Sequence, residues 1–242
     1  MKDIEFIGKS LFFKKEKVLV IADIHIGFEE SLTKSGVFLP RNQYKIIKND
    51  IKKIVDKSGK VDEIVILGDL KHEFGEISSQ EWSDVMDFLS FLSDHCDKII
   101  LIKGNHDRVL GPIAEKKGLE VMDYYIKNEN CFVHGDKKYD DCFSRDVKRI
   151  IMGHKHAAIS IQEDVKREVY KCFLVGKFKG KEIIILPSFF PLTEGVEVNL
   201  DNLEDTNLCF DLDLSKFDAY VPVPEESKVL KLGKVRDIGV LE

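Results

Sequence analysis

Residues 17–25 have the sequence KVLVIADIH, an aliphatic run that ends in a carboxylate and an imidazole. An aliphatic run without polar alternation is typical of a strand that is buried on both faces of a parallel sheet. Apolar residues then recur at helical spacing over residues 41–57, and residues 63–67 form a second aliphatic run. Strand, helix and strand in this order predict a βαβ unit with parallel pairing.

The alternation continues with residues 81–92, which have helical spacing, and residues 98–102, which are aliphatic again. Beyond Glu120 the apolar runs are shorter and closer together, which predicts a second, more antiparallel sheet packed on the first. Its expected strands are residues 131–133, 150–152, 158–161, 169–178 and 182–186. We therefore expect an α/β fold, a β-sandwich of mixed sheets flanked by helices, in a single domain of residues 1–242.

The composition is that of a globular protein. Of the 242 residues 43% are hydrophobic, so the chain has enough apolar surface for a core. The aliphatic runs are far shorter than the roughly 20 residues of a membrane span, and no secretion signal precedes them. We expect a cytoplasmic protein.

Residues 201–226 hold eight acidic residues and one lysine, so residues 201–242 are expected to form an acidic loop and short closing strands.

The cysteines and the charges each suggest a simple interpretation. The five cysteines are widely spaced and never occur as Cys-x-x-Cys, which predicts buried thiols and argues against a disulfide framework. The net charge is −6, yet residues 137–181 hold twelve Lys and Arg against six Asp and Glu. This basic window is either a surface for an anionic partner or a set of solvated strand faces.

Polar clusters follow five of the predicted strands. Five of the seven histidines lie in these clusters, and His72 follows Asp69 by three residues. The carboxyl ends of strands in an open α/β sheet line one crevice, so clusters that are remote in sequence converge in space. The clusters are Asp23-Ile24-His25, Gly68-Asp69, Gly104-Asn105-His106-Asp107, His134-Gly135-Asp136 and Gly153-His154-Lys155-His156.

The side chains in these clusters are carboxylates, an amide and imidazoles, which are ligands of hard to borderline divalent cations. Asp23 and His25 can reach one ion only if the chain turns as it leaves the sheet, which Gly27 permits. Seven candidate ligands exceed what one metal site uses while it leaves room for water and substrate. Two metal ions that share one carboxylate fit this number better.

The ordered series Asp-x-His, Gly-Asp, Gly-Asn-His-Asp, His and Gly-His-x-His, from residue 23 to residue 156, resembles the calcineurin-like metallophosphoesterases. The resemblance implies the metallophosphoesterase-type β-sandwich and a hydrolase that acts on phosphate esters. The metal ligands that it implies are Asp23, His25 and His156 for one ion, Asn105, His134 and His154 for the other, and Asp69 as the bridge between them.

The same resemblance assigns catalytic roles to His106 and Asp107. His106 corresponds to the histidine that stabilises the transition state and protonates the leaving oxygen, and Asp107 to a residue that orients and charges it. His72 is either a contact to a substrate phosphate at the rim of the cleft or an ordinary loop histidine. Phe189 and Phe190 either anchor their loop in the core, which we favour, or stack on a nucleobase.

A narrower resemblance rests on Gly27-Phe28-Glu29-Glu30, Gly36, Leu39-Pro40 and Gln43, followed by residues 68–72. These residues resemble the archaeal SbcD-related phosphoesterases and the bacterial ligase-associated DNA repair endonucleases, which are small and manganese-dependent. The resemblance implies a Mn2+-dependent endonuclease on single-stranded DNA or RNA in DNA repair, with Fe, Co, Ni or Zn as alternative metals. The short C-terminal part argues against an ATPase partner, and a homo-oligomer is left open.

Two other functions stay open. A small-molecule phosphodiesterase or phosphomonoesterase, acting on a nucleotide or another phosphate ester, agrees with the overall acidity of the chain. A non-catalytic scaffold, like the retromer subunit of this superfamily, is disfavoured because this chain keeps the site residues that the scaffold branch has lost.

Overall fold

The computed structural model describes residues 3–39, 42–72, 77–164, 166–200, 208–223 and 228–241. Its first sheet has six strands in the order β1-β2-β3-β4-β5-β6. Strand β4 pairs in parallel with β3 and with β5, which confirms the predicted βαβ units, and the antiparallel β1–β2 hairpin extends the sheet. The strands are β1 (Ile4–Ile7), β2 (Ser10–Phe13), β3 (Val18–Ile21), β4 (Val61–Leu67), β5 (Cys96–Ile102) and β6 (Val121–Met122).

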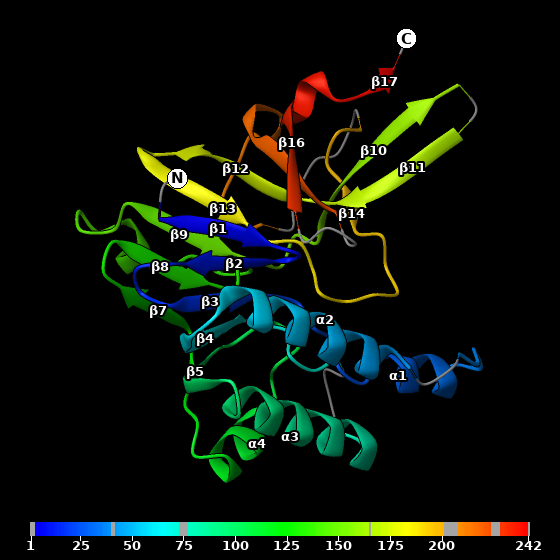
Figure 1. Cartoon of the computed structure of the whole chain (residues 1–242), viewed down its shortest axis with the longest axis vertical. Helices are drawn as coiled ribbons and strands as arrows, with labels where there is room; N and C mark the ends of the chain where they lie inside the picture. Colours follow the sequence, from blue (N-terminus) through cyan, green and yellow to red (C-terminus); the bar gives the residue numbers. More distant parts are fainter. Residues whose placement is uncertain are drawn as a thin grey trace.

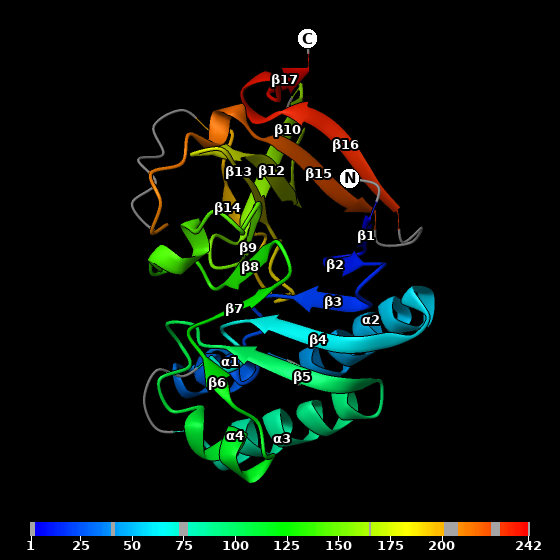
Figure 2. The same cartoon turned by 90° about the vertical axis from the view of Figure 1, so that its left-hand side faces the viewer.

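Helices cover the outer face of this sheet, as Figure 2 shows for α2 and α3. The predicted helix over residues 41–57 is confirmed from Gln43 onward, while Arg41 lies outside the described residues. The predicted helix over residues 81–92 begins earlier, because the Ser78 side chain accepts a hydrogen bond from the Glu81 amide and caps the first turn. The helices are α1 (Phe28–Lys34), α2 (Gln43–Ser58), α3 (Ser79–Ser93) and α4 (Gly111–Lys116).

Strand β3 is buried on both faces. Leu19 and Ile21 pack on the helix side, whereas Val18, Val20 and Ala22 pack toward the second sheet. Side chains alternate along a strand, so a strand between two apolar layers needs an unbroken aliphatic sequence. The fold therefore explains the run that precedes Asp23.

The second sheet packs face to face on the first (Figure 2) and has the strand order β16-β15-β12-β13-β9-β8-β7. Strand β9 pairs in parallel with β8 and β13, and the other pairs in this sheet are antiparallel, which confirms the predicted mixed sandwich. The strands are β7 (Tyr124–Lys127), β8 (Asn130–Val133), β9 (Arg149–Met152), β12 (Phe173–Phe178), β13 (Lys181–Ile185), β15 (Asp218–Val223) and β16 (Lys228–Lys234).

A small third sheet contains two segments that were expected in the second sheet. Residues 158–161 belong to β10, which pairs with β11, β14 and β17. The expected strand 169–178 is two strands, because the chain passes from one sheet to another at Cys172. The β10–β11 hairpin projects from the sandwich in Figure 1. The strands are β10 (Ala157–Glu163), β11 (Lys166–Lys171), β14 (Val196–Glu197) and β17 (Val240–Leu241).

The C-terminal segment is less loop-like than its acidic composition suggests. Leu208, Phe210 and Phe217 are buried against the outer face of the second sheet, and β15 and β16 are the closing strands. Residues 201–207 and 224–227 of the expected acidic loop lie outside the described residues.

None of the helices within the described ranges combines the length and the apolar character needed to span a bilayer. The expected cytoplasmic location stays a prediction.

The cysteines differ in part from the expectation of unpaired thiols. Cys131 on β8 and Cys142 in a short 3-10 helix form a disulfide, with 5.5 Å between their Cα atoms. Their 11-residue separation in sequence carries no signal for this pair, and only the fold brings them together. Cys172 is a buried thiol as predicted, and Cys96 and Cys209 are partly exposed.

Candidate metal centre

The candidate site lies where strands of both sheets end. Past the ends of β3 and β4 the two loops run side by side, because the amides of Ile24 and His25 donate to the Asp69 carbonyl at 3.0 and 2.9 Å. The loop after β9 joins them through the His154 amide, which donates to the Asp23 carboxylate at 3.0 Å. The structure thus brings together the seven predicted ligands, which are Asp23, His25, Asp69, Asn105, His134, His154 and His156.

One group of donor atoms combines Asp23, His25, Asp69 and His156, whose ligand atoms all lie within 4.8 Å of one another. His25 Nε2 lies 3.2 Å from His156 Nε2 and 3.7 Å from Asp69 Oδ2. His156 Nε2 lies 3.7 Å from Asp23 Oδ1. Two imidazole nitrogens and two carboxylates around one point form a donor set that suits a divalent transition-metal ion.

A second group combines Asp69, His134 and His154. His134 Nε2 lies 3.4 Å from Asp69 Oδ2, 3.0 Å from His154 Nδ1 and 3.0 Å from the Asn105 side-chain oxygen. Asp69 is the residue that both groups share. Its carboxylate therefore lies where a bridge between two cations would have to lie.

The backbone orients the His134 imidazole. Its Nδ1 lies 2.8 Å from the Leu67 carbonyl oxygen, and because a carbonyl only accepts, Nδ1 carries the hydrogen. The other nitrogen, Nε2, faces Asp69 and Asn105 and is the one available to a cation. Ligand histidines in metal sites usually donate their second nitrogen to such an acceptor. The residues of both groups therefore fit divalent cations.

Burial and mutual attraction determine how these residues ionise. Burial opposes ionisation of Asp23 and Asp69, yet the surrounding imidazoles, His156 and His134 foremost, hold the pKa of both carboxyls below the usual range. Burial also disfavours a charged His134, but Asp69 raises the pKa of that imidazole to about 10. Burial lowers the pKa of His25 to about 3. His25 is thus neutral at physiological pH, whereas His134 would have to release its Nε2 proton to bind a cation.

Five predicted ligands adopt a left-handed backbone conformation. They are five of the nine non-glycine residues with positive φ in the described parts of the chain. This conformation costs a non-glycine residue roughly 1 kcal/mol or more, and such strain is typical of functional sites. The left-handed conformation turns the chain at the ligands themselves, and Gly27, where the turn was expected, also has a positive φ of 98°. The five residues are Asp23, His25, Asp69, His154 and His156.

The backbone at Gly104 packs directly on Asp69. A Cβ atom at residue 104 would lie 2.2 Å from Asp69 Oδ1 and 2.3 Å from the Asp69 amide nitrogen. Both distances are shorter than nonbonded atoms allow, so a side chain at this position would displace the shared carboxylate.

We expect the substitution Gly104→Ala to lower kcat/KM for a nitrophenyl phosphodiester by roughly tenfold to a hundredfold, because ångström-scale displacement of a catalytic group has effects of this size. Gly111→Ala is the matched control, since a Cβ there meets no atom within 4 Å. Steady-state kinetics of the two variants give the comparison. Equal rates would contradict the close packing of Gly104 on Asp69.

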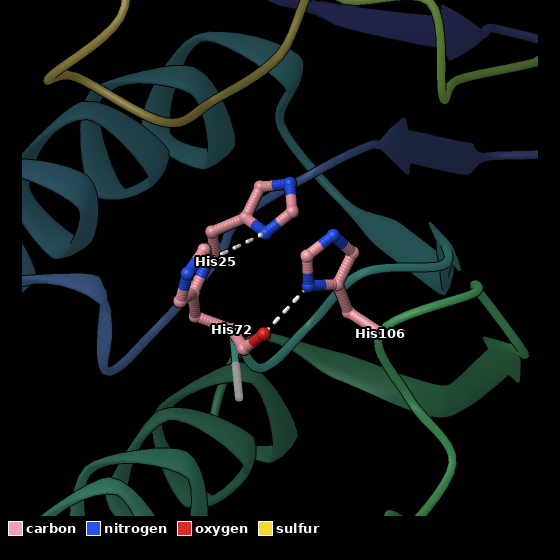
Figure 3. Close-up of side chains that lie close together, drawn as sticks. All are labelled: His25, His72 and His106. Atoms are coloured by element: carbon pink, nitrogen blue, oxygen red, sulfur yellow. Dashed lines mark hydrogen bonds between the residues drawn. The ribbon is translucent and has the colours of Figure 1, made fainter. Parts of the chain in front are cut away.

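His106 lies at the rim of the site with His72 and His25 (Figure 3). Its Nδ1 donates to the His72 carbonyl oxygen at 2.6 Å, and His72 Nδ1 lies 3.4 Å from His25 Nδ1. His72 therefore lies beside the donor groups, where a contact to a substrate phosphate would require it. Its carbonyl also orients His106, a role that the sequence did not indicate.

Asp107 connects two loops of the site. It is buried, and its carboxylate accepts hydrogen bonds from the amides of Gly104, Leu70 and Lys71 at 3.0, 3.4 and 3.4 Å. Burial and the negative charge of Asp69 raise the pKa of Asp107 to about 6. Asp107 thus ties the loop after β5 to the loop after β4. The expectation that Asp107 also orients and charges the His106 imidazole stays a prediction.

An aromatic pocket of about 210 Å³ adjoins His25. Phe28 and Phe190 line it with ring centroids 4.6 Å apart, and the Phe190 ring lies 5.5 Å from that of His25. Phe189 is fully buried in the core beneath the helices, so for this residue the favoured interpretation as a loop anchor is confirmed. Phe190 is also buried, with only 4% of its surface exposed, and it lines the pocket.

The basic window of residues 137–181 does not form a free cationic surface at the site. At least five of its cations form ion pairs, among them Arg149 with Glu182 at 2.7 Å. Arg149 begins β9, whereas the site lies at the opposite end of that strand. Lys155, between two predicted ligands, is only 4% exposed. These contacts favour the second interpretation, in which the window consists of solvated strand faces.

Comparisons with known proteins identify the family of this chain and solved structures with a similar fold. A family model described as calcineurin-like phosphoesterase matches residues 16–220, which include every predicted site residue. Among curated proteins nothing matches. Among solved structures, the Pseudomonas putida nuclease MPE is similar over 95% of this chain and 94% of that chain, with 17% sequence identity and a TM-score of 0.63. The Escherichia coli phosphoesterase Yfce is 12% identical over 90% of this chain and 98% of that chain, with a TM-score of 0.43.

Proposed function

This chain belongs to the calcineurin-like phosphoesterases, and from that membership we propose a phosphodiesterase that holds two divalent cations and cuts single-stranded nucleic acid internally. The observation that carries the proposal is the sharing of Asp69 by two groups of donor atoms. Imidazole and carboxylate donors suit manganese, iron, cobalt, nickel or zinc better than magnesium or calcium, and we propose manganese.

The residues of the chain have distinct tasks in this proposal. Two cations, when bound, would supply the positive charge that attracts phosphate oxygens and lowers the pKa of an attacking water. His106 is held by the His72 carbonyl through Nδ1, which leaves Nε2 to give a proton to the leaving oxygen. Asp107 keeps the loop that carries His106 in place through its bonds to the amides of Leu70 and Lys71.

The depth of the site favours a flexible substrate. Asp23, Asp69 and His134 are each at most 2% exposed, so a phosphate must enter a recess to reach them. A single strand can bend a phosphate into such a recess, whereas a stiff duplex resists bending on this scale. The name of the similar Pseudomonas putida protein, a nuclease, supports nucleic acid as the substrate class.

A small phosphate ester is the second candidate substrate. The net charge of −6 and the ion pairs within the basic window weaken the attraction of a polynucleotide to this chain. A nucleotide or another small ester would not need a long cationic surface. A non-catalytic scaffold fits less well, because both groups of donor atoms are present.

We expect the purified protein with manganese to cut closed circular single-stranded DNA, because an endonuclease needs no chain end. Gel electrophoresis of the circle, with circular duplex as the control, measures this activity. RNA and bis-nitrophenyl phosphate are tested beside it. Intact circles together with rapid turnover of nucleotides or other small esters would reject the nuclease and support the second candidate.

A further inference from the structure

A cavity of about 410 Å³ lies across the loop of residues 188–191 from the candidate metal centre. Phe190 lines the pocket beside His25, and the next residue, Pro191, lines this cavity. The turn at Lys9 joins β1 to β2, and because β2 pairs antiparallel with β3, it lies at the same edge of the sheet as Asp23. A chain that leaves the metal centre along this edge would reach the cavity.

The walls of the cavity carry an excess of positive charge. Lys9, Lys53 and Lys171 line it, and Asp50 is the one acidic residue among its described lining residues. Asp50 pairs with Lys9 at 3.3 Å. One carboxylate thus faces three lysine side chains, so positive charge exceeds negative charge on the walls.

Two of these ammonium groups are held in place by backbone carbonyls. Lys171 donates to the carbonyls of Ser188, at 3.2 Å, and Phe190, and Lys9 donates to the carbonyl of Phe189 at 3.3 Å. A carbonyl oxygen orients an ammonium group without neutralising it. Burial, and to a lesser extent the nearby charge of Lys9, lower the pKa of Lys171 to about 7, while Asp23 acts in the opposite direction. An anion in the cavity would offset the repulsion between Lys9 and Lys171.

The rest of the lining is apolar and suits the remainder of a nucleotide. Tyr170, Pro191 and Pro222 line the cavity beside the lysines, and Tyr170 is 36% exposed. Sugars and bases pack on such surfaces while phosphates bind cations. The volume lies within the range of about 300 to 1,000 Å³ that is typical of ligand sites.

We propose that this lysine cavity binds a phosphate group of the substrate strand other than the one that is cut. The inference rests on the proposed nuclease function and adds to it a second phosphate subsite, to which Lys171 of the basic window contributes together with Lys9 and Lys53. The same chemistry would also accept a free phosphate ion, so the experiment must separate a strand from a free ion.

The first test compares two charge reversals on helix α2. Lys53 lines the cavity, whereas its neighbour Lys52 is also exposed but does not line it. Lys53→Glu and Lys52→Glu change the net charge identically. We measure the inhibition constant of a single-stranded oligonucleotide against hydrolysis of bis-nitrophenyl phosphate. Lys53→Glu should raise this inhibition constant by about tenfold or more and make its dependence on salt concentration shallower. Lys52→Glu should change the inhibition constant by less than about twofold.

The second test does not depend on turnover. Lysines of the complete protein are acetylated with and without ligand, and the rate at each lysine is read by mass spectrometry. An oligonucleotide should slow the reaction of Lys53 severalfold and leave Lys52 unchanged, whereas inorganic phosphate at the same phosphate concentration should protect much less. Equal protection by phosphate would show that the cavity takes the free ion and overturn the claim about the strand.

The two proposals fail in different ways. If circular DNA is cut while the two charge reversals behave alike and Lys53 is not protected, the second subsite is wrong and the nuclease stands. If an oligonucleotide protects Lys53 but is never cut, the cavity binds a strand and the nuclease proposal fails.

Discussion

Replacing Asp69 by asparagine should remove both cations and lower kcat/KM by about a thousandfold or more, because such cations contribute several kcal/mol to transition-state stabilisation. Asp69 belongs to both groups of donor atoms, and its Oδ2 lies 3.4 Å from His134 Nε2 and 3.7 Å from His25 Nε2. Asparagine keeps the shape of the side chain but removes the negative charge that two adjacent cations require. Elemental analysis of the manganese-loaded protein and kinetics on bis-nitrophenyl phosphate measure the two effects.

Two variants make this result specific. Asp97→Asn removes an exposed carboxylate at the start of β5, the end of the strand away from the site, and should keep the parental metal content and rate. Asp23→Ala removes a donor from one group alone and should lower the metal content less than Asp69→Asn does. If Asp69→Asn retained two ions per chain, the shared position of this carboxylate would have no role in metal binding.

Replacing His106 by alanine should leave both cations bound and slow the reaction by about a hundredfold or more, the usual range for loss of a general acid or base. The substitution removes an imidazole at the rim that belongs to neither of the two groups sharing Asp69. The loss should depend on the leaving group. Nitrophenol is acidic and leaves without much help, whereas a nucleotide hydroxyl needs a proton, so the loss should be larger on an oligonucleotide.

The comparison of the two substrates distinguishes a proton donor from a fixed charge. Equal losses on both would reject the general-acid role and leave electrostatic stabilisation of the transition state. A fall in metal content would instead make His106 a part of the metal centre. Alanine at His95, which lies beyond the end of α3 and contacts the Phe91 carbonyl, is a control for loss of a histidine elsewhere.

The sequence predicted where the ligands converge but not how each side chain is directed. The aliphatic run before Asp23 needs two apolar layers, and that requirement alone places the polar residue after it at the edge of a sheet. The direction of Asp107, by contrast, depends on the path of its loop, and its carboxylate is directed at the amides of Leu70 and Lys71. Adjacent sequence positions carry no information about that path.

Long-range contacts account for the other differences between the expectations from the sequence and the structure. The carbonyl of His72 orients His106 because the loops after β4 and β5 lie together, which no local pattern encodes. The disulfide between Cys131 and Cys142 likewise follows from the fold. The net charge of the basic window does not show where its cations are paired, because Arg149 meets its partner Glu182 on a neighbouring strand.

The donor groups draw on both sheets, and this has a mechanical consequence. Asp23 and Asp69 follow strands of the first sheet, and His134 and His154 follow strands of the second. A cation held by residues from both would cross-link segments as remote as residues 23 and 156, and its binding energy would add to the folding energy. A chelator would then remove a link between the two sheets of the sandwich together with the reactive centre. Loss of catalysis and loss of resistance to unfolding should accompany each other in this protein.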